Sequence, residues 1–391
     1  MNKTCKNCAG RLIYDIQKNG LLCETCGTLF SVNDYENLSK DSESEVVFNK
    51  DDEFLDVNIY ACSACGAEIS VTDTEVSTFC IYCGNPTLLF SRIGKMRRPD
   101  SILPFTVTKE KALKLVTKRF HQGCFIPKEI KNIQSEQLRS IYIPYYVSHV
   151  EYDSSILFCA SQKDNPYRLR SAYASMPNVT TDASKVIDNE LSQRIEPYPL
   201  EKLEDFNENY LVGHYADMPD MQIEDAKEIA KSQARDAYNR SIAESIEGAP
   251  KPVIVAERYR AEIYDPLKIV LLPAWFLTIR YQDQPYTLIV NGQTGKVVAG
   301  LPWDKKRFWL LMVALTLCFS IICFFISWGV LSIQKRDLLG AFSGYITAFF
   351  LVAIGYIILS ARKIRRIIAS IRRTCANPLH EYVNNRQEGE A

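Results

Sequence analysis

Residues 5–26 read CKNCAGRLIYDIQKNGLLCETC and contain two Cys-x-x-Cys pairs with fourteen residues between them. Residues 62–83 read CSACGAEISVTDTEVSTFCIYC and repeat the same spacing. A Cys-x-x-Cys turn directs two thiolates at one ion, and a second pair completes the tetrahedral site that zinc prefers. We therefore predict two structural Zn²⁺ ions with four ligands each. The predicted ligands are Cys5, Cys8, Cys23 and Cys26 in the first quartet, and Cys62, Cys65, Cys80 and Cys83 in the second.

The residues between the cysteine pairs have β-strand character. Residues 11–16 and 68–72 are rich in β-prone side chains, and glycines close to the pairs suit the turns of a zinc knuckle. The sequence thus predicts two small β zinc ribbons, at residues 1–33 and 58–92. A redox dithiol is the alternative, but that motif occurs singly in a βαβ context. Four thiolates fill the coordination sphere, so we expect structural zinc with no catalytic role.

Charge is unevenly distributed along the chain, although the formal net charge is zero. Residues 34–57 hold nine acidic residues against two lysines, which predicts an acidic flexible linker between the ribbons. Residues 1–98 hold 14 acidic against 10 basic residues, which is unfavourable for binding phosphates. Nucleic-acid binding is therefore the less favoured interpretation. Its candidate surface is the basic cluster after the second ribbon, formed by Arg92, Lys95, Arg97 and Arg98.

Residues 93–303 alternate between helical and strand-like patterns, which predicts a central α+β domain with an antiparallel sheet. Each half has a helical pattern followed by an apolar strand with an internal proline, at residues 141–147 and 270–277. Each half is expected to form one helix-hairpin unit. The domain is therefore a candidate for internal duplication.

The sequence contains no recognisable catalytic motif. It lacks a phosphate-binding loop, a Gly-x-Ser-x-Gly elbow and a His-Glu-x-x-His motif. The four histidines are scattered, which favours structural roles for them; they are His121, His149, His214 and His380. We predict no catalytic residue and no cofactor other than zinc. An enzyme with an unrecognised site in the central domain stays open as an alternative.

Two uncharged apolar runs lie at residues 308–333 and 338–361, and each exceeds the roughly 20 residues needed to cross a bilayer. They predict a C-terminal transmembrane α-helical hairpin in a multidomain chain. Flanking positive residues and reduced cysteines predict that both termini are cytosolic. Residues 362–375 form a basic amphipathic helical pattern, followed by a tail at residues 376–391. This helix would bind anionic lipid through Arg365, Arg366, Arg372 and Arg373.

Five short motifs, together with the ribbons, resemble a known family. They are ILPF at residues 102–105, YIPYY at 142–146, IEPY at 195–198, YLVG at 210–213 and VNGQTG at 290–295. The family is that of bacterial zinc-ribbon membrane proteins, whose ribbon is of the transcription-factor type and which are often labelled as similar to the replication-restart helicase. The resemblance covers most of the chain and implies a place in the bacterial inner membrane. It implies no helicase activity, because the sequence has no phosphate loop.

These features together predict a membrane-anchored scaffold or adaptor that is not an enzyme. Its two zinc ribbons would be displayed in the cytosol for a protein partner, and membrane attachment would raise their effective concentration. The sequence indicates no small-molecule substrate. A membrane-associated nucleic-acid-binding protein is the first alternative, and an enzyme with a site in the central domain is the second.

Overall fold

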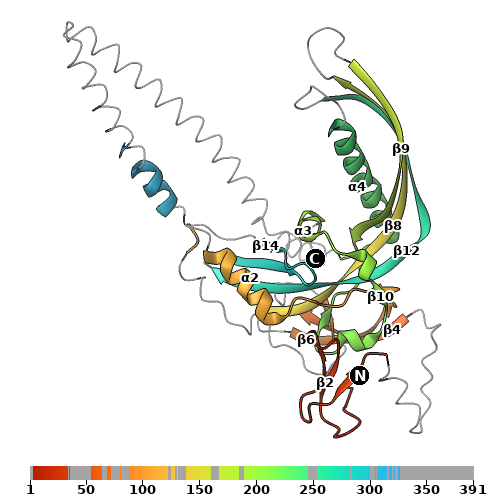
Figure 1. Ribbon diagram of the computed structural model, residues 1–391, viewed down its shortest axis with the longest axis vertical. Helices are drawn as coiled ribbons and strands as arrows, with labels where there is room; N and C mark the ends of the chain where they lie inside the picture. Colours follow the sequence, from red (N-terminus) through yellow and green to blue (C-terminus); the bar gives the residue numbers. More distant parts are fainter. Residues whose placement is uncertain are drawn as a thin grey trace.

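The structure is a computed structural model (Figure 1). It describes residues 3–33, 35, 54–63, 68–71, 80, 88–121, 125–127, 130, 138–159, 167–184, 189–244, 253–281, 284–299, 304, 306–314, 317, 318, 321 and 325. In these residues β-strands predominate and helices are few.

The secondary-structure elements alternate along the chain in short and very long segments. The strands are β1 (Leu12–Asp15), β2 (Gly20–Cys23), β3 (Leu29–Ser31), β4 (Phe54–Cys62), β5 (Glu68–Val71), β6 (Leu88–Arg97), β7 (Ser101–Ile102), β8 (Leu138–Cys159), β9 (Tyr167–Asp182), β10 (Glu204–Asp205), β11 (Tyr215–Ala216), β12 (Val253–Tyr281), β13 (Gln284–Asn291) and β14 (Val297–Ala299). The helices are α2 (Lys109–His121), α3 (Asn189–Ile195) and α4 (Ile223–Glu244), with 3-10 helices η3 (Leu200–Lys202) and η4 (Glu208–Leu211).

The described strands form two sheets. The first has the order β1-β2-β3, and the second is 11-stranded within the described residues, with the main path β10-β7-β12-β8-β11-β5-β4-β6. Strands β13 and β14 extend from β12, and β9 pairs with β8. Because β5 pairs with β11, the strands beside the second cysteine quartet continue the central sheet.

The centre of the large sheet is the antiparallel pair of β8 and β12, in which Ile143 lies opposite Leu272. The pairing is approximately symmetric about these two residues. Along its other edge, β8 pairs first with β11, which is parallel to it, and further along with β9, which is antiparallel. Along its other edge, β12 pairs first with β7, which is parallel to it, and further along with β13, which is antiparallel. The two halves of the domain therefore pair crosswise, each supplying one central strand.

Matched hydrogen bonds extend this symmetry to the turns before the helices. The amide of Ala183 donates to the Pro144 carbonyl (3.0 Å), and the amide of Gly292 donates to the Pro273 carbonyl (2.9 Å). Each of these two residues also accepts two hydrogen bonds from the chain that leads into a helix. The Ala183 carbonyl accepts the amides of Asp220 and Met221, just before α4. The Gly292 carbonyl accepts the amides of Thr106 and Val107, just before α2. The two halves of the central domain therefore share this hydrogen-bond pattern, and the internal duplication itself stays a prediction.

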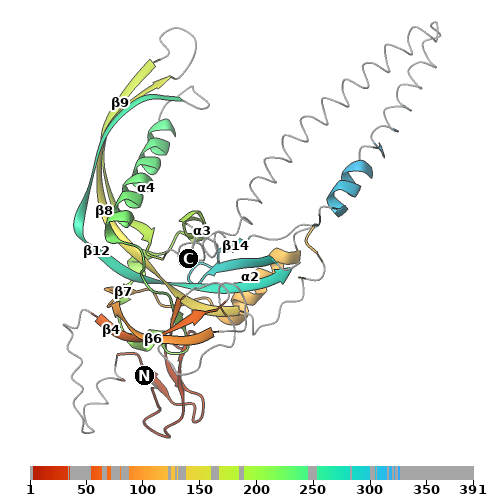
Figure 2. The same ribbon diagram turned by 180° about the vertical axis from the view of Figure 1, so that it is seen from behind.

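Helix α4 lies on the concave side of the long strands β8, β9 and β12, as both views show (Figures 1 and 2). It packs against them through a stripe of buried residues at every fourth position, which is the spacing of one helical face. The stripe consists of Ala226, Ala230, Ala234 and Tyr238. Small side chains let the helix approach the sheet closely, and the Tyr238 hydroxyl donates to the Ala172 carbonyl at 2.8 Å.

The structure corrects the predicted C-terminal membrane hairpin and the two-span membrane localisation. Among the described residues, no helix is both long and apolar enough to cross a membrane. At the start of the first predicted span, the described continuous helix covers residues 306–314. An uncharged run determines composition only, whereas a span also needs a continuous helix of sufficient length.

Several predicted segments lie outside the described residues. They are most of the linker at 34–57, most of the run at 308–333, and all of the run at 338–361, the amphipathic helix at 362–375 with Arg365, Arg366, Arg372 and Arg373, and the tail at 376–391. The end of the linker region belongs to β4, which begins at Phe54.

Candidate metal centre

The first quartet is carried by two backbone turns of the same design. In the first, the Cys5 amide donates to the Gly10 carbonyl and the Ala9 amide donates to the Cys5 carbonyl, both at 2.7 Å. In the second, the Gly27 amide donates to the Cys23 carbonyl at 2.9 Å. Ala9 and Gly27 occupy matching positions with φ values of 56° and 72°. The left-handed backbone suits glycine and is strained for alanine.

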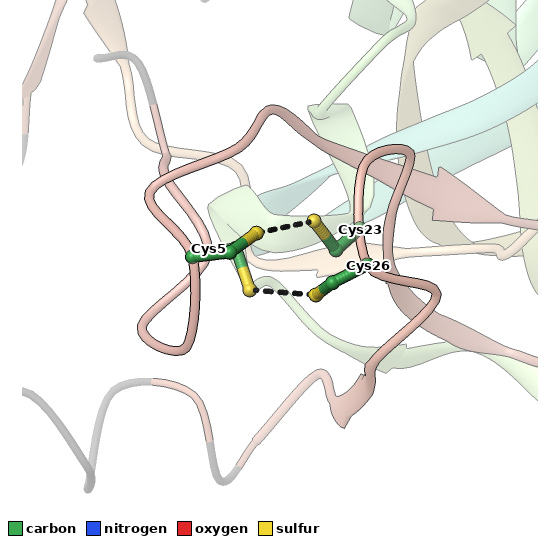
Figure 3. A group of neighbouring side chains, drawn as sticks. Cys5, Cys23 and Cys26 are labelled. Atoms are coloured by element: carbon green, nitrogen blue, oxygen red, sulfur yellow. Dashed lines mark hydrogen bonds between the residues drawn. The ribbon is translucent and has the colours of Figure 1, made fainter.

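The two turns bring the four cysteines of the first quartet together (Figure 3). The sulfur of Cys5 lies 3.6 Å from that of Cys26, and the sulfur of Cys8 lies 3.5 Å from that of Cys23. All four sulfurs lie within 4.8 Å of one another. A tetrahedral ion with zinc–sulfur bonds of about 2.3 Å requires sulfurs about 3.8 Å apart. The cluster can therefore hold one metal ion.

Hydrogen bonds lower the pKa values of two of the four cysteines and so favour their thiolates, the metal-binding form of cysteine. The hydroxyl and the amide of Thr28 lower the pKa of Cys26 to about 6, and the Thr28 Oγ1 lies 3.1 Å from its sulfur. The Cys26 amide lowers the pKa of Cys23. The Gly10 amide lowers the pKa of Cys8, but the adjacent thiols, Cys26 first, outweigh it and raise that pKa to about 12. A cation bound by these sulfurs would displace the protons of any that are still thiols.

The ribbon that carries the first quartet is docked on the central domain. The Tyr14 amide donates to the Val212 carbonyl at 3.1 Å. The Asn209 Nδ2 donates to the Val32 carbonyl at 2.6 Å, and the Asn209 Oδ1 accepts a hydrogen bond from Lys3. The ribbon side chains also join a buried cluster with residues of the large sheet; its members include Cys5, Leu12, Leu21, Cys23, Phe105, Tyr142, Tyr210 and Trp275. The ribbon is therefore a fixed part of the fold.

The second quartet is described only in part. Cys62 and Cys80 are both buried and belong to the same apolar cluster, next to the central strands. Cys65 and Cys83 lie outside the described residues. The geometry of this second predicted site therefore stays a prediction.

The basic cluster proposed for nucleic acid lies in and just after β6, within the sheet. Lys95 is exposed and Arg97 is partly buried, while only the backbone of Arg92 is described. The Arg98 guanidinium lies over the Phe206 ring, 5.5 Å from its centre, and thus belongs to the packing of the domain. The nucleic-acid interpretation stays a prediction.

One histidine has a more specific environment than the sequence suggested. His214 is buried between the ribbon and the central sheet, and its ring stacks on Phe105 with centres 4.9 Å apart. Its position follows from Gly213, whose φ of 84° turns the chain immediately before β11. A lone histidine gives no local signal for such a place, because the surrounding groups come from distant segments.

Comparison with known proteins gives a distant relative and no family. No family model matches the chain, and no solved structure matches it. Among curated proteins, the uncharacterised protein YdjG of Bacillus subtilis strain 168 is 25% identical over 320 residues. The match covers 78% of this chain and 90% of that protein. The two chains are therefore similar over most of their lengths.

Proposed function

We propose that the cluster of Cys5, Cys8, Cys23 and Cys26 binds one Zn²⁺ ion with a structural role. The observation that carries this proposal is the convergence of four sulfurs within 4.8 Å. An all-thiolate set is characteristic of structural zinc, and it leaves no coordination position for water or substrate. The ion would join the two turns of the ribbon and keep its apolar side against the central domain.

A second Zn²⁺ ion at Cys62, Cys65, Cys80 and Cys83 is part of the same proposal. It is supported by the identical spacing of the second quartet and by the burial of Cys62 and Cys80 in one cluster. An ion there would tie the end of β4 to the chain that leads into β6. Both ions would then stabilise the same edge of the molecule.

The biochemical role that we propose is that of a scaffold or adaptor without catalytic activity. The docked ribbon supports this role, because it presents its outer turns at a fixed angle to the central domain. Lys6, Asn7 and Glu24 are exposed on these turns, and the Asn7 Nδ2 donates to the Thr28 hydroxyl at 3.2 Å, which links the two turns. A rigid polar surface of this kind suits recognition of a protein partner.

Metal analysis of the purified full-length protein tests the zinc part of the proposal. We expect two zinc ions per chain, with one lost in Cys8→Ser and one lost in Cys83→Ser. Cys159→Ser is the matched control, because Cys159 lies at the far end of β8 and belongs to neither quartet. Retention of both ions in Cys8→Ser, or substoichiometric zinc in the wild type, would contradict the proposal.

Crosslinking tests the adaptor role separately. A photoreactive residue at position 7 should capture a specific protein in cells, and the double variant Lys6→Glu, Glu24→Lys should lose that product while retaining zinc. A photoreactive residue at the exposed Arg119 of α2 serves as the control position. If the same products form from both positions, or if the double variant captures its partner normally, the outer turns are not the docking surface.

A further inference from the structure

A cleft of about 660 Å³ lies between the ribbon and the central domain. Its walls come from five segments: β1 with its flanking residues, the start of α2, the start of β8, the turn before β11, and Trp275 of β12. This volume is within the range of about 300–1,000 Å³ that is typical of small-molecule sites. The lining residues that matter here are Arg11, Ile13, Lys109, Arg139, His214 and Trp275.

His214 is a buried polar side chain at the cleft, and only one of its two ring nitrogens has a protein partner among the described residues. Its side chain is more than nine-tenths buried, and its Nδ1 lies 2.7 Å from the Ser140 hydroxyl. The Nε2 atom has no hydrogen-bond partner in the described part of the chain. Burial lowers the pKa of His214 to about 4, so the ring is neutral at pH 7. If the Ser140 hydroxyl donates to Nδ1, the ring proton is on Nε2, and this buried N–H group has no acceptor among the described residues.

The charged groups around the cleft favour a negative ligand. Arg11, Lys109 and Arg139 contribute three positive charges from three different walls, against two carboxylates. One of these carboxylates, Asp15, already accepts the amides of Gln17 and Lys18 in its own turn. Arg139 is partly buried and has neither a hydrogen bond nor an ion pair among the residues that the structure describes.

Helix α2 adds to this positive field. Thr108 precedes the helix and its hydroxyl accepts the Lys111 amide at 3.3 Å, which marks the N-terminal cap. Thr108, Lys109 and Glu110 all line the cleft, so the positive end of the helix dipole lies at its wall. The Glu110 carboxylate offsets part of this positive field. Attraction of a negative ligand therefore depends on Arg11 and Arg139.

The remaining wall is apolar. The Trp275 indole N–H donates to the Val107 carbonyl at 2.8 Å, so this polar atom is already engaged and the ring presents carbon atoms. Ile13 and Leu138 complete the apolar lining. A ligand that fits both surfaces carries an acidic group on an apolar body.

We propose that this cleft binds a small organic anion, a carboxylate on an aromatic or aliphatic body, with Arg11 and Arg139 as its charged contacts. Because one wall belongs to the ribbon, the ligand would bridge the metal-bound module and the central domain. The site is separate from the outer turns proposed for a protein partner.

Titration with 1-naphthoate, followed through tryptophan fluorescence and calorimetry, tests the proposal on the full chain. We expect saturable one-to-one binding, and about tenfold weaker binding of the neutral analogue 1-naphthalenemethanol, because a charge-assisted hydrogen bond is lost. Arg139→Gln and Arg11→Gln should each weaken 1-naphthoate about tenfold. Arg119→Gln removes an exposed cation of α2 outside the cleft and should leave binding unchanged.

Three results would overturn the proposal: no binding of 1-naphthoate, equal affinity for the neutral analogue, or unchanged affinity in both cleft variants. Equal competition by inorganic phosphate would also overturn it, since the apolar wall would then contribute nothing. Thermal melts of the cleft variants establish that they are folded. Zinc content measured in parallel separates a failure of the cleft from a failure of the ribbon.

Discussion

Asn209 joins the metal-binding ribbon to the central domain, and Asn209→Ala should undock the ribbon. The side chain is fully buried, with its Nδ2 bonded to the Val32 carbonyl and its Oδ1 bonded to Lys3. Alanine would leave the Val32 carbonyl without this donor, and an unsatisfied buried group costs about 1–3 kcal/mol. We expect a loss of about 2 kcal/mol, which is roughly a 30-fold increase in the population of the undocked ribbon.

Limited proteolysis and urea unfolding measure this effect. Cleavage within residues 12–31 should become about 30-fold faster in Asn209→Ala, if opening and closing are fast relative to cleavage. Asn7→Ala is the matched control, because it removes an exposed amide of the same ribbon and should change stability by less than about 0.5 kcal/mol. If the two variants are equally stable and equally resistant to protease, Asn209 does not fasten the ribbon and the reasoning fails.

Three further substitutions give independent checks. Ala9→Gly should raise the free energy of unfolding by about 0.5–1 kcal/mol, because Ala9 is exposed and has the positive φ that Gly27 has in the other turn; a chemical denaturation curve measures it. Asp182→Asn should stabilise the protein by about 1 kcal/mol at pH 7 in the same assay, since burial raises the pKa of Asp182 well above its usual range and the matching residue of the other copy is Asn291. His214 is buried in its neutral form, so the unfolded chain takes up a proton near pH 6.5 and the folded chain only near pH 4. The free energy of unfolding should therefore be highest above pH 6.5 and fall by up to about 3 kcal/mol as the pH falls towards 4. The free energy of unfolding of His214→Phe should depend less on pH over that range. A parallel pH profile in the variant would contradict the assignment.

The parts of the fold that the sequence predicts are those that depend on nearby residues. The four ligands of the first quartet lie on two short turns, so their spacing alone indicates that their sulfurs converge. The repeated apolar strands with internal prolines, around Pro144 and Pro273, likewise indicate two similar units. Both signals come from short segments that have few alternative conformations.

The parts that the sequence does not predict depend on distant pairings. Asn209 and Val32 are separated by 177 positions, and no periodic pattern links them. Strand β11 pairs with β8, and β5 pairs with β11, so the strands beside the second quartet join the central sheet. These pairings also join segments that are far apart in the sequence, and no local pattern indicates them. The cleft at His214 needs five separate segments, so its residues have no common sequence motif. The apolar runs near the C-terminal end misled in another way, because their composition does not determine helix length.

Hydrogen exchange with and without bound metal tests the central claim, that one ion holds the ribbon on the central domain. Removing the metal from the full-length protein with a chelator should abolish protection in β1–β3 and also in η4, where Asn209 lies, while the long strands β8 and β12 stay protected. Adding back one equivalent of Zn²⁺ should restore protection in both places. Unchanged protection of β1–β3 after complete metal removal would contradict the account.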